Sequence, residues 1–265
     1  TRCETCKTET IQFKGMGTEK LEEEITKLFP DKVIRRMDSD STTKPGSHEY
    51  ILNAFREGLI NILVGTQMIA KGHDFRRITL VAAVNPDGAL FSSDFRAPER
   101  LFSLLMQAAG RAGRDASLGA QSEVWLQTFQ PEHGLYAALK KHDYPTFAAQ
   151  QLKEREQANM PPFSAQALVR ADAKTQAAAQ AFLNLAAAAA GNLPHREDVT
   201  LYPAVPLTIQ RVANVERAQL LVEAVSRSAL QRFLHAWQGV LLHTRSAPEA
   251  KGLIRFAVDV DPVSI

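Results

Sequence analysis

The chain has 265 residues, of which 45% are hydrophobic and 23% are charged, and its formal net charge is +2. This length and composition are those of a soluble globular protein with one large domain or two of ordinary size. No apolar run reaches the roughly 18 residues that a membrane span needs and no signal peptide is recognised, so we expect a cytoplasmic protein that contacts no membrane.

Two cysteines, Cys3 and Cys6, stand near the beginning of the chain at C-x-x-C spacing. Thiolates at this spacing can occupy two corners of a tetrahedral zinc site. A redox-active pair is a competing interpretation, but it needs a preceding strand that nothing before Cys3 supplies; incidental thiols are another. Because the chain has only two cysteines, we expect half of a zinc site.

Strand-like and helix-like segments alternate from residue 8 to about residue 130. The expected strands are residues 10–14, 32–37, 61–64, 78–84 and 123–127, and the expected helices are residues 19–29 and 47–57. We expect Thr18 to cap the first helix and Gly58 to end the second. The strands from residue 61 onward are expected to be buried. Single helices between strands imply right-handed crossovers, so this part is predicted to be α/β, a parallel sheet with helices on both faces.

The expected strand 61–64 leads into Gly65, Thr66 and Gln67, and then into Gly72 and Asp74. In open parallel sheets, ligands bind beyond the carboxyl ends of the strands, which is where these residues are expected to lie. The competing interpretation is an ordinary polar loop after a strand.

Gln107, Gly110, Arg111 and Arg114 form the pattern Q-x-x-G-R-x-G-R with a further glycine at position 113. In an α-helix these four residues share one face, at i, i+3, i+4 and i+7. Glycines inside a helix destabilise it by about 1 kcal/mol each relative to alanine, so we expect close approach of a ligand. A phosphate chain suits two guanidinium groups. The alternative is a solvated arginine face on a core helix.

A second region begins after the helical stretch 133–159, where Pro161 and Pro162 mark a boundary. The elements expected beyond it are strand 165–171, helix 174–190, an antiparallel pair 207–211 and 219–225, helix 226–237 and strand 254–260. This order predicts a smaller α+β sandwich with helices on one face of an antiparallel sheet. Four arginines could gather on one side of it, although a solvated face is the favoured interpretation: Arg211, Arg217, Arg227 and Arg232.

The octet that begins at Gln107 resembles motif VI of superfamily 2 helicases, and residues 65–75 resemble motif V. Other segments narrow the resemblance to the bacterial primosomal protein N′ (PriA) family of replication-restart DNA helicases. They are the Cys3/Cys6 lead-in to residues 15–19, residues 87–100, Met160 with the two prolines, and residues 259–262. The resemblance covers essentially the whole chain and is weakest over residues 172–250.

This resemblance implies three parts: the end of a zinc-binding insertion (1–10), a RecA-like helicase lobe two with trailing helices (11–160), and a C-terminal α+β domain (161–265). It also implies the C-terminal half of an ATP-dependent 3′→5′ DNA helicase that recognises stalled forks and D-loops and initiates primosome assembly. The implied cofactors are ATP with Mg²⁺, and Zn²⁺. The implied partners are DNA, single-stranded-DNA-binding protein and other primosome proteins, and the protein is expected to be a monomer.

The family's roles transfer to matching positions as expectations: Gln107, Arg111 and Arg114 as catalytic, Gly72 and Asp74 as ATP-binding, Thr66 and Gln67 as DNA-binding, and Cys3 and Cys6 as zinc ligands. Because no G-x-x-x-x-G-K-[ST] loop occurs in the chain, we expect this fragment alone to be inactive. Two alternatives stand beside this prediction: another superfamily 2 nucleic-acid translocase, and a non-enzymatic module that binds DNA or a partner.

Overall fold

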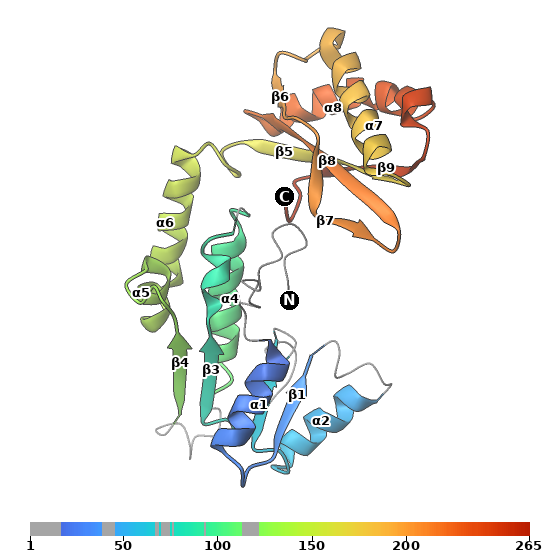
Figure 1. The fold of residues 1–265 in the computed structure, drawn as a ribbon. Helices are drawn as coiled ribbons and strands as arrows, with labels where there is room; N and C mark the ends of the chain where they lie inside the picture. Colours follow the sequence, from blue (N-terminus) through green and yellow to red (C-terminus); the bar gives the residue numbers. More distant parts are fainter. Residues whose placement is uncertain are drawn as a thin grey trace, which may run out of the picture. The chain divides into compact units, whose positions relative to one another are not determined.

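A computed structural model describes residues 17–38, 46–66, 69, 75, 77–92, 94–112 and 122–265. The chain forms two compact units (Figure 1). The first contains Thr1–Leu90 and Arg100–His142, and the second contains Phe91–Glu99 and Asp143–Ile265. The domain boundary expected at residues 160/161 stays a prediction. In the described part of the chain, no helix is both long enough and apolar enough to cross a membrane.

The described part of the first unit opens with a helix–strand–helix–strand arrangement. Its elements are α1 (Thr18–Leu28), β1 (Ile34–Met37), α2 (Ser47–Arg56) and β2 (Ile62–Gly65). β1 and β2 are parallel, with Ile34 opposite Ile62 and Met37 opposite Gly65. Side chains from both strands, α2 and the following residues form the core beside this pair, including Met37, Leu52 and Phe75. The predicted end of α2 is confirmed, because Gly58 adopts a positive φ of 79° after the helix.

The expectation that Thr18 caps the first helix is wrong. The N-cap position is Gly17, which makes no side-chain cap, and Thr18 is already helical. Its hydroxyl donates instead to the Asp38 carboxylate, at 2.5 Å between Oγ1 and Oδ2. The tertiary partner at the end of β1 therefore replaces the local cap that the sequence suggested.

A second parallel pair follows in the same unit. It consists of β3 (Leu80–Val84) and β4 (Glu123–Gln127), with η1 (Pro86–Ala89) after β3 and α5 (Gly134–Lys140) after β4; α4 (Ala97–Ala109) lies between the strands in sequence. The parallel pairing predicted from the alternation of elements is thus confirmed. The described residues form two two-stranded sheets rather than one. The predicted strand 10–14 lies outside the described residues.

Burial of β3 and β4 differs from the prediction. We expected buried strands, but Leu80 is 46% exposed and Trp125 is 58% exposed. Exposed side chains alternate along β3 and predominate along β4, so the faces of this two-stranded sheet are not covered on both sides as the prediction required.

One buried carboxylate joins three elements of the first unit. Asp87, in η1, is 5% exposed and accepts hydrogen bonds from Thr128 Oγ1 (2.6 Å), Tyr136 Oη (2.6 Å) and the Phe129 amide (2.7 Å). Burial alone would raise the pKa of Asp87, but these three donors outweigh it and hold the pKa below its usual value. The same burial and the Asp87 contact raise the pKa of Tyr136 to about 12.

The second unit contains a five-stranded sheet. Its elements are α6 (Tyr144–Gln157), β5 (Ala165–Ala173), α7 (Gln176–Ala189), η3 (Ala190–Asn192), β6 (Val199–Leu201), β7 (Val205–Val212), β8 (Val215–Ala224), α8 (Arg227–Thr244), η4 (Pro248–Ala250) and β9 (Leu253–Val260). The strand order is β6-β8-β5-β9, and β7 also pairs with β8. The strand pairs are antiparallel, and α7 and α8 pack on one face (Figure 1). The predicted α+β sandwich is confirmed.

The sequence explains why this sheet and these helices pack closely. Alternate residues of β5 and β8 point into the core, and α7 presents small side chains such as Ala179 and Ala186 to it. Trp237 of α8 is fully buried, and its indole nitrogen donates to the Ala186 carbonyl at 2.8 Å. Thr175 and Ser226 cap the two helices through their hydroxyls, each of which accepts a backbone N–H three residues on.

Four local features of the chain confirm the prediction, differ from it or refine it. The expected helical stretch 133–159 is two helices, α5 and α6, separated at His142, whose φ is 55°. The β7–β8 turn is at Ala213 and Asn214 as predicted, and both have positive φ, as a two-residue hairpin turn requires. The short strand β6 was not predicted, and α8 continues to Thr244.

We predict that Asp87→Asn destabilises the first unit by about 2 kcal/mol, because an amide cannot accept from all three buried donors. Urea unfolding followed by circular dichroism measures the change. The control is Asp31→Asn, an exposed carboxylate of the same unit that should leave stability nearly unchanged. Equal effects of the two substitutions would contradict the prediction.

The stabilisation by Asp87 should also depend on pH. Its folded-state pKa lies below the ordinary value of 3.8, so the unfolded chain binds the proton more readily. The contribution is therefore present above about pH 4 and is lost as the pH falls through the folded-state pKa. Melting temperatures of the wild type and Asp87→Asn should approach each other only in that acidic range.

Candidate nucleotide and nucleic-acid site

Three of the predicted site residues lie in the described part of the chain: Thr66, Gln107 and Arg111. The others lie outside the described residues: Cys3, Cys6, Gln67, Gly72, Asp74 and Arg114. The three described residues belong to two separate segments of the first unit. Thr66 comes directly after β2, while Gln107 and Arg111 come from the end of α4.

The helix α4 separates its apolar and polar residues cleanly. Leu101, Phe102 and Leu105 are buried, whereas Ser103 and Gln107 are exposed. Gln107 donates from Nε2 to Ser103 Oγ at 3.2 Å, one turn back along the helix. The amide group is therefore held at the polar edge of α4, where it is accessible to solvent.

The α-helix ends earlier than the motif predicts. α4 stops at Ala109. The Gly110 amide still bonds four residues back, to Met106 at 3.0 Å, but the two amides after it bond three residues back: Arg111 to Ala108 at 3.0 Å and Ala112 to Ala109 at 3.1 Å. Arg111 is thus half-buried in a tighter turn after the helix, not on its regular face. The helix-face spacing expected for Arg111 is wrong for this reason.

Gly110 lies just past the helix, so the cost that we assigned to a glycine inside it does not apply there. The backbone angle φ of Gly110 is not positive. A Cβ at this position would meet its nearest neighbours, the Met106 and Gln107 carbonyls, at 3.4 and 3.6 Å, which is ordinary contact. Neither backbone conformation nor space within the described fold requires glycine at position 110.

Gly65 is the opposite case. A Cβ there would lie 2.2 Å from the Met37 carbonyl oxygen and 2.4 Å from Ile69 Cδ1. The absence of a side chain lets the end of β2 approach the end of β1 and brings the exposed Thr66 to the same edge as Asp38. Sequence reasoning placed Thr66 correctly after a strand, but the need for glycine depends on a residue 28 positions earlier.

Asp38 is a residue of this edge that the predicted site did not include. It is 7% exposed, accepts from Thr18, and lies 3.5 Å from the Arg36 guanidinium. Arg36 also faces Glu19 and Glu22 of α1 at 3.8 and 3.7 Å. The sequence signal for Asp38 is its position directly after the predicted strand 32–37. The acidic surroundings of Arg36 leave it little capacity for a phosphate.

The four arginines that could have formed a basic surface on the second unit all have partners. Arg211 faces Glu216 (3.6 Å), Arg227 faces Asp261 (2.7 Å) and Arg232 faces Asp198 (3.7 Å), while Arg217 donates to the Ile209 carbonyl at 2.6 Å. They come from β7, β8 and α8 and are mostly exposed, with Arg217 half-buried. Acidic and carbonyl partners fit the solvated-face interpretation better than a phosphate-binding patch.

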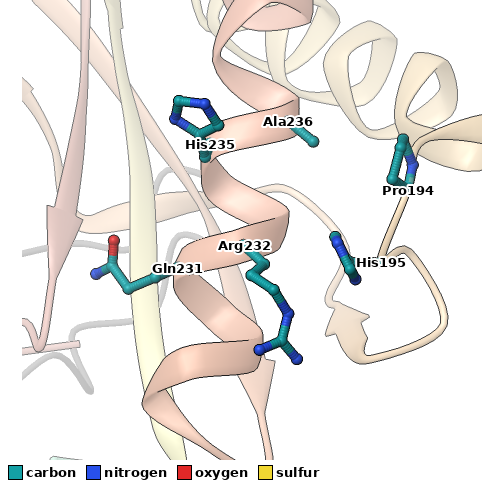
Figure 2. Close-up of a pocket in the computed structure, with 6 residues that line it drawn as sticks. All are labelled: Pro194, His195, Gln231, Arg232, His235 and Ala236. Atoms are coloured by element: carbon teal, nitrogen blue, oxygen red, sulfur yellow. The ribbon is translucent and has the colours of Figure 1, made fainter.

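An open hollow of about 520 Å³ lies on the second unit between α8 and the loop that follows η3. Figure 2 shows its lining, with Gln231, Arg232, His235 and Ala236 on the helix and Pro194 and His195 on the loop. Asp198 lies 3.3 Å from His195 Nδ1 as well as near Arg232, so the positive charge of the hollow is partly balanced.

Comparison with known proteins identifies both units. The helicase conserved C-terminal domain matches residues 7–116, and the primosomal protein N C-terminal domain matches residues 156–263. The chain is 39% identical over 264 residues to the replication restart protein PriA of Haemophilus influenzae, which covers 98% of this chain and 34% of that protein. The corresponding PriA of Synechocystis is 36% identical over 263 residues (99% of the chain, 30% of that protein). The PriA of Bacillus subtilis is 45% identical over 167 residues, which cover 63% of this chain and 20% of that protein.

The fold and these matches define a helicase C-terminal lobe followed by a primosomal C-terminal domain. The chain belongs to the PriA family of replication restart proteins and corresponds to its C-terminal region. It spans about a third of the length of the Haemophilus relative. The match over residues 156–263 also separates it from superfamily 2 translocases in general.

We predict that Gly65→Ala disrupts the β1–β2 pair, because the added Cβ would overlap the Met37 carbonyl. The expected loss of stability is at least about 2 kcal/mol. Gly88→Ala is a matched control, since a Cβ there meets nothing within 4 Å. Chemical denaturation of both variants distinguishes them, and a Gly65→Ala protein as stable as Gly88→Ala would show that the end of β2 can move away.

Proposed function

We propose that this chain is the C-terminal part of an ATP-dependent 3′→5′ DNA helicase that acts on stalled forks and D-loops in replication restart. The observation that carries this proposal is the end of α4. There an exposed glutamine is followed by a glycine that the described fold does not need and by an arginine. A glycine without an internal reason is explained by a ligand that approaches the backbone closely.

The residues present suit a nucleotide. Bound ATP with Mg²⁺ would supply the phosphoanhydride bond whose cleavage drives movement. Arg111 and Arg114 would neutralise charge on the phosphates, and Gln107 would respond to the terminal phosphate. Gly72 and Asp74 would approach the nucleotide from the loop after β2. These residues hold and orient phosphate oxygens, a task for which the planar guanidinium fork is well suited.

We propose that the loop after β2 contacts DNA. Thr66 and Gln67 would hold the backbone of a single strand, because hydroxyl and amide groups bind phosphate without reading sequence. Thr66 is exposed at the carboxyl end of β2, where a ligand can reach it. Contacts at β2 and at α4 within one unit would couple nucleotide turnover to strand movement. Single-stranded-DNA-binding protein and other primosome proteins are the proposed partners of the full-length protein, which we propose to be a monomer.

In the full-length protein, Arg114→Ala should lower DNA-stimulated ATP turnover at least about 100-fold while DNA binding stays near normal. An arginine that acts on the transferring phosphate affects kcat more than nucleotide affinity. Arg114→Lys should restore little, because a point charge does not reproduce the planar fork. Steady-state ATPase assays at saturating DNA measure the effect. Arg77→Ala, an exposed arginine of the same unit, is the control.

A near-normal kcat in Arg114→Ala would favour the alternative that Arg114 belongs to a solvated face. It would also remove the main support for the proposal. Thr66→Ala should have the converse effect and weaken single-strand binding more than ATP turnover. Loss of turnover without any change in DNA binding in Thr66→Ala would contradict the division of roles between the two segments.

Zinc is proposed only for the full-length protein. Cys3 and Cys6 supply two thiolates, half of a tetrahedral shell. The described residues contain no group of three His, Cys, Asp or Glu side chains that could hold a metal ion. The described residues therefore do not complete a closed structural site, and we propose that the remaining ligands come from other parts of the full-length protein.

Cys3→Ser in the full-length protein should lower bound zinc by about one ion per chain, since loss of a thiolate opens the shell. Elemental analysis of the purified protein gives the count, with Ser103→Ala as a substitution far from the cysteines in sequence. Unchanged zinc content would show that these thiols are incidental.

A further inference from the structure

Polar side chains of the first unit join the first turn of α1 to the carboxyl end of β1. Thr18, the first residue of α1, donates from Oγ1 to Asp38 Oδ2 at 2.5 Å, and Asp38 directly follows β1. The Arg36 guanidinium lies 3.5 Å from the same carboxylate, and 3.8 and 3.7 Å from those of Glu19 and Glu22. We call Thr18, Arg36 and Asp38 the β1-end cluster.

The β1-end cluster is largely shielded from solvent. The Asp38 side chain is 10% exposed and that of Arg36 is 21% exposed, although both carry a charge. A carboxylate at this depth needs a hydrogen-bond donor and a counter-ion, and Thr18 and Arg36 supply them. Loss of either partner leaves a shielded charge less well compensated, so the geometry of the cluster is strongly preferred over alternatives.

The β1-end cluster contributes much of what holds α1 to the strand, because apolar packing of this helix is incomplete. α1 lies against β1 (Figure 1). All eleven residues of α1 are described, and none of them is buried. Its apolar residues Leu21 and Ile25 are half-buried, and Leu28 is 72% exposed. The polar contacts at the first turn therefore fix the helix and the end of β1 to each other.

The end of β1 in turn supports the end of β2. Met37 and Gly65 are the last paired residues of the two strands, and a Cβ on Gly65 would lie 2.2 Å from the Met37 carbonyl oxygen. The two backbones are therefore in close contact just before Asp38 and Thr66. Because closely packed groups transmit a displacement rather than absorb it, a shift of Asp38 changes the position of Thr66.

We propose that Thr18, Arg36 and Asp38 are positioning residues for Thr66, and that they set the affinity of the loop after β2 for a single DNA strand. The β1-end cluster holds the end of β1, and the Met37–Gly65 contact passes this constraint to the Thr66 hydroxyl. The cluster does not touch the DNA. Arg36 offsets the Asp38 charge, which would otherwise repel a phosphate. The effect on DNA rests on the proposed function, whereas the mechanical part concerns the two strand ends alone.

Hydrogen–deuterium exchange of the full-length protein tests the mechanical part. Thr18→Val removes the hydroxyl with little change of shape and should accelerate exchange of the amides of residues 64–66 about fivefold. Thr18→Ser keeps the hydroxyl and should exchange like the wild type. Thr26→Val is the matched control, because the Thr26 hydroxyl donates to the Glu22 carbonyl within α1. Acceleration confined to α1, none at all, or an equal effect of Thr26→Val would overturn the positioning role.

Binding of a fluorescent oligo-dT strand to the full-length protein, measured by anisotropy at fixed salt, tests the effect on DNA. Thr18→Val should weaken binding about fivefold, and Thr18→Ser should restore it. The double variant Thr18→Val/Thr66→Ala should bind no more weakly than Thr66→Ala alone, because the cluster acts through Thr66.

Two results would overturn the effect on DNA: additive losses in the double variant, or normal binding by Thr18→Val where Thr66→Ala binds weakly. Unchanged binding by Thr66→Ala would instead contradict the proposed DNA contact itself. The exchange experiment needs no DNA and decides the mechanical part in either case.

Discussion

Helix α4 carries the constraint on which the candidate site depends, because its buried residues leave only one polar edge of the helix exposed. Near its beginning Glu99 pairs with Arg155 at 2.7 Å, and along its apolar side Leu101, Phe102 and Leu105 are buried. What remains is a polar edge that ends at Gln107. The side chains that we propose for nucleotide binding therefore stand at the exposed edge and the end of a helix whose other side is buried.

Close packing in the parallel pair β1–β2 shapes the second segment of the candidate site. Gly65 brings the ends of the two strands together, and the exposed Thr66 follows directly. Asp38 closes the end of β1 through Thr18 rather than facing solvent. One strand end is therefore engaged in the fold, while the other is left available. This asymmetry leaves Thr66 accessible for the contact with a nucleic-acid strand that we propose.

The C-terminal domain has a surface whose charges largely balance one another. On the open face of its sheet, Arg170 lies 3.2 Å from Asp259 and Arg255 lies 2.7 Å from Asp172. Such pairs add little to stability, yet they reduce the field that would attract a polyanion. This agrees with a net charge of only +2 and means that any contact of this domain with DNA would depend on individual positions.

The sequence by itself determined the family, the parallel and antiparallel halves, and local signals such as Gly58 after α2 and the turn at Asn214. These depend on periodicity, turn chemistry and motif spacing, which a local pattern contains. Only the tertiary structure decided that Thr18 binds Asp38, that Gly65 must lie beneath a carbonyl from another strand, and that Arg155 anchors α4. Each of these joins residues at least 20 positions apart, and no local pattern encodes which distant groups folding brings within hydrogen-bond or van der Waals distance.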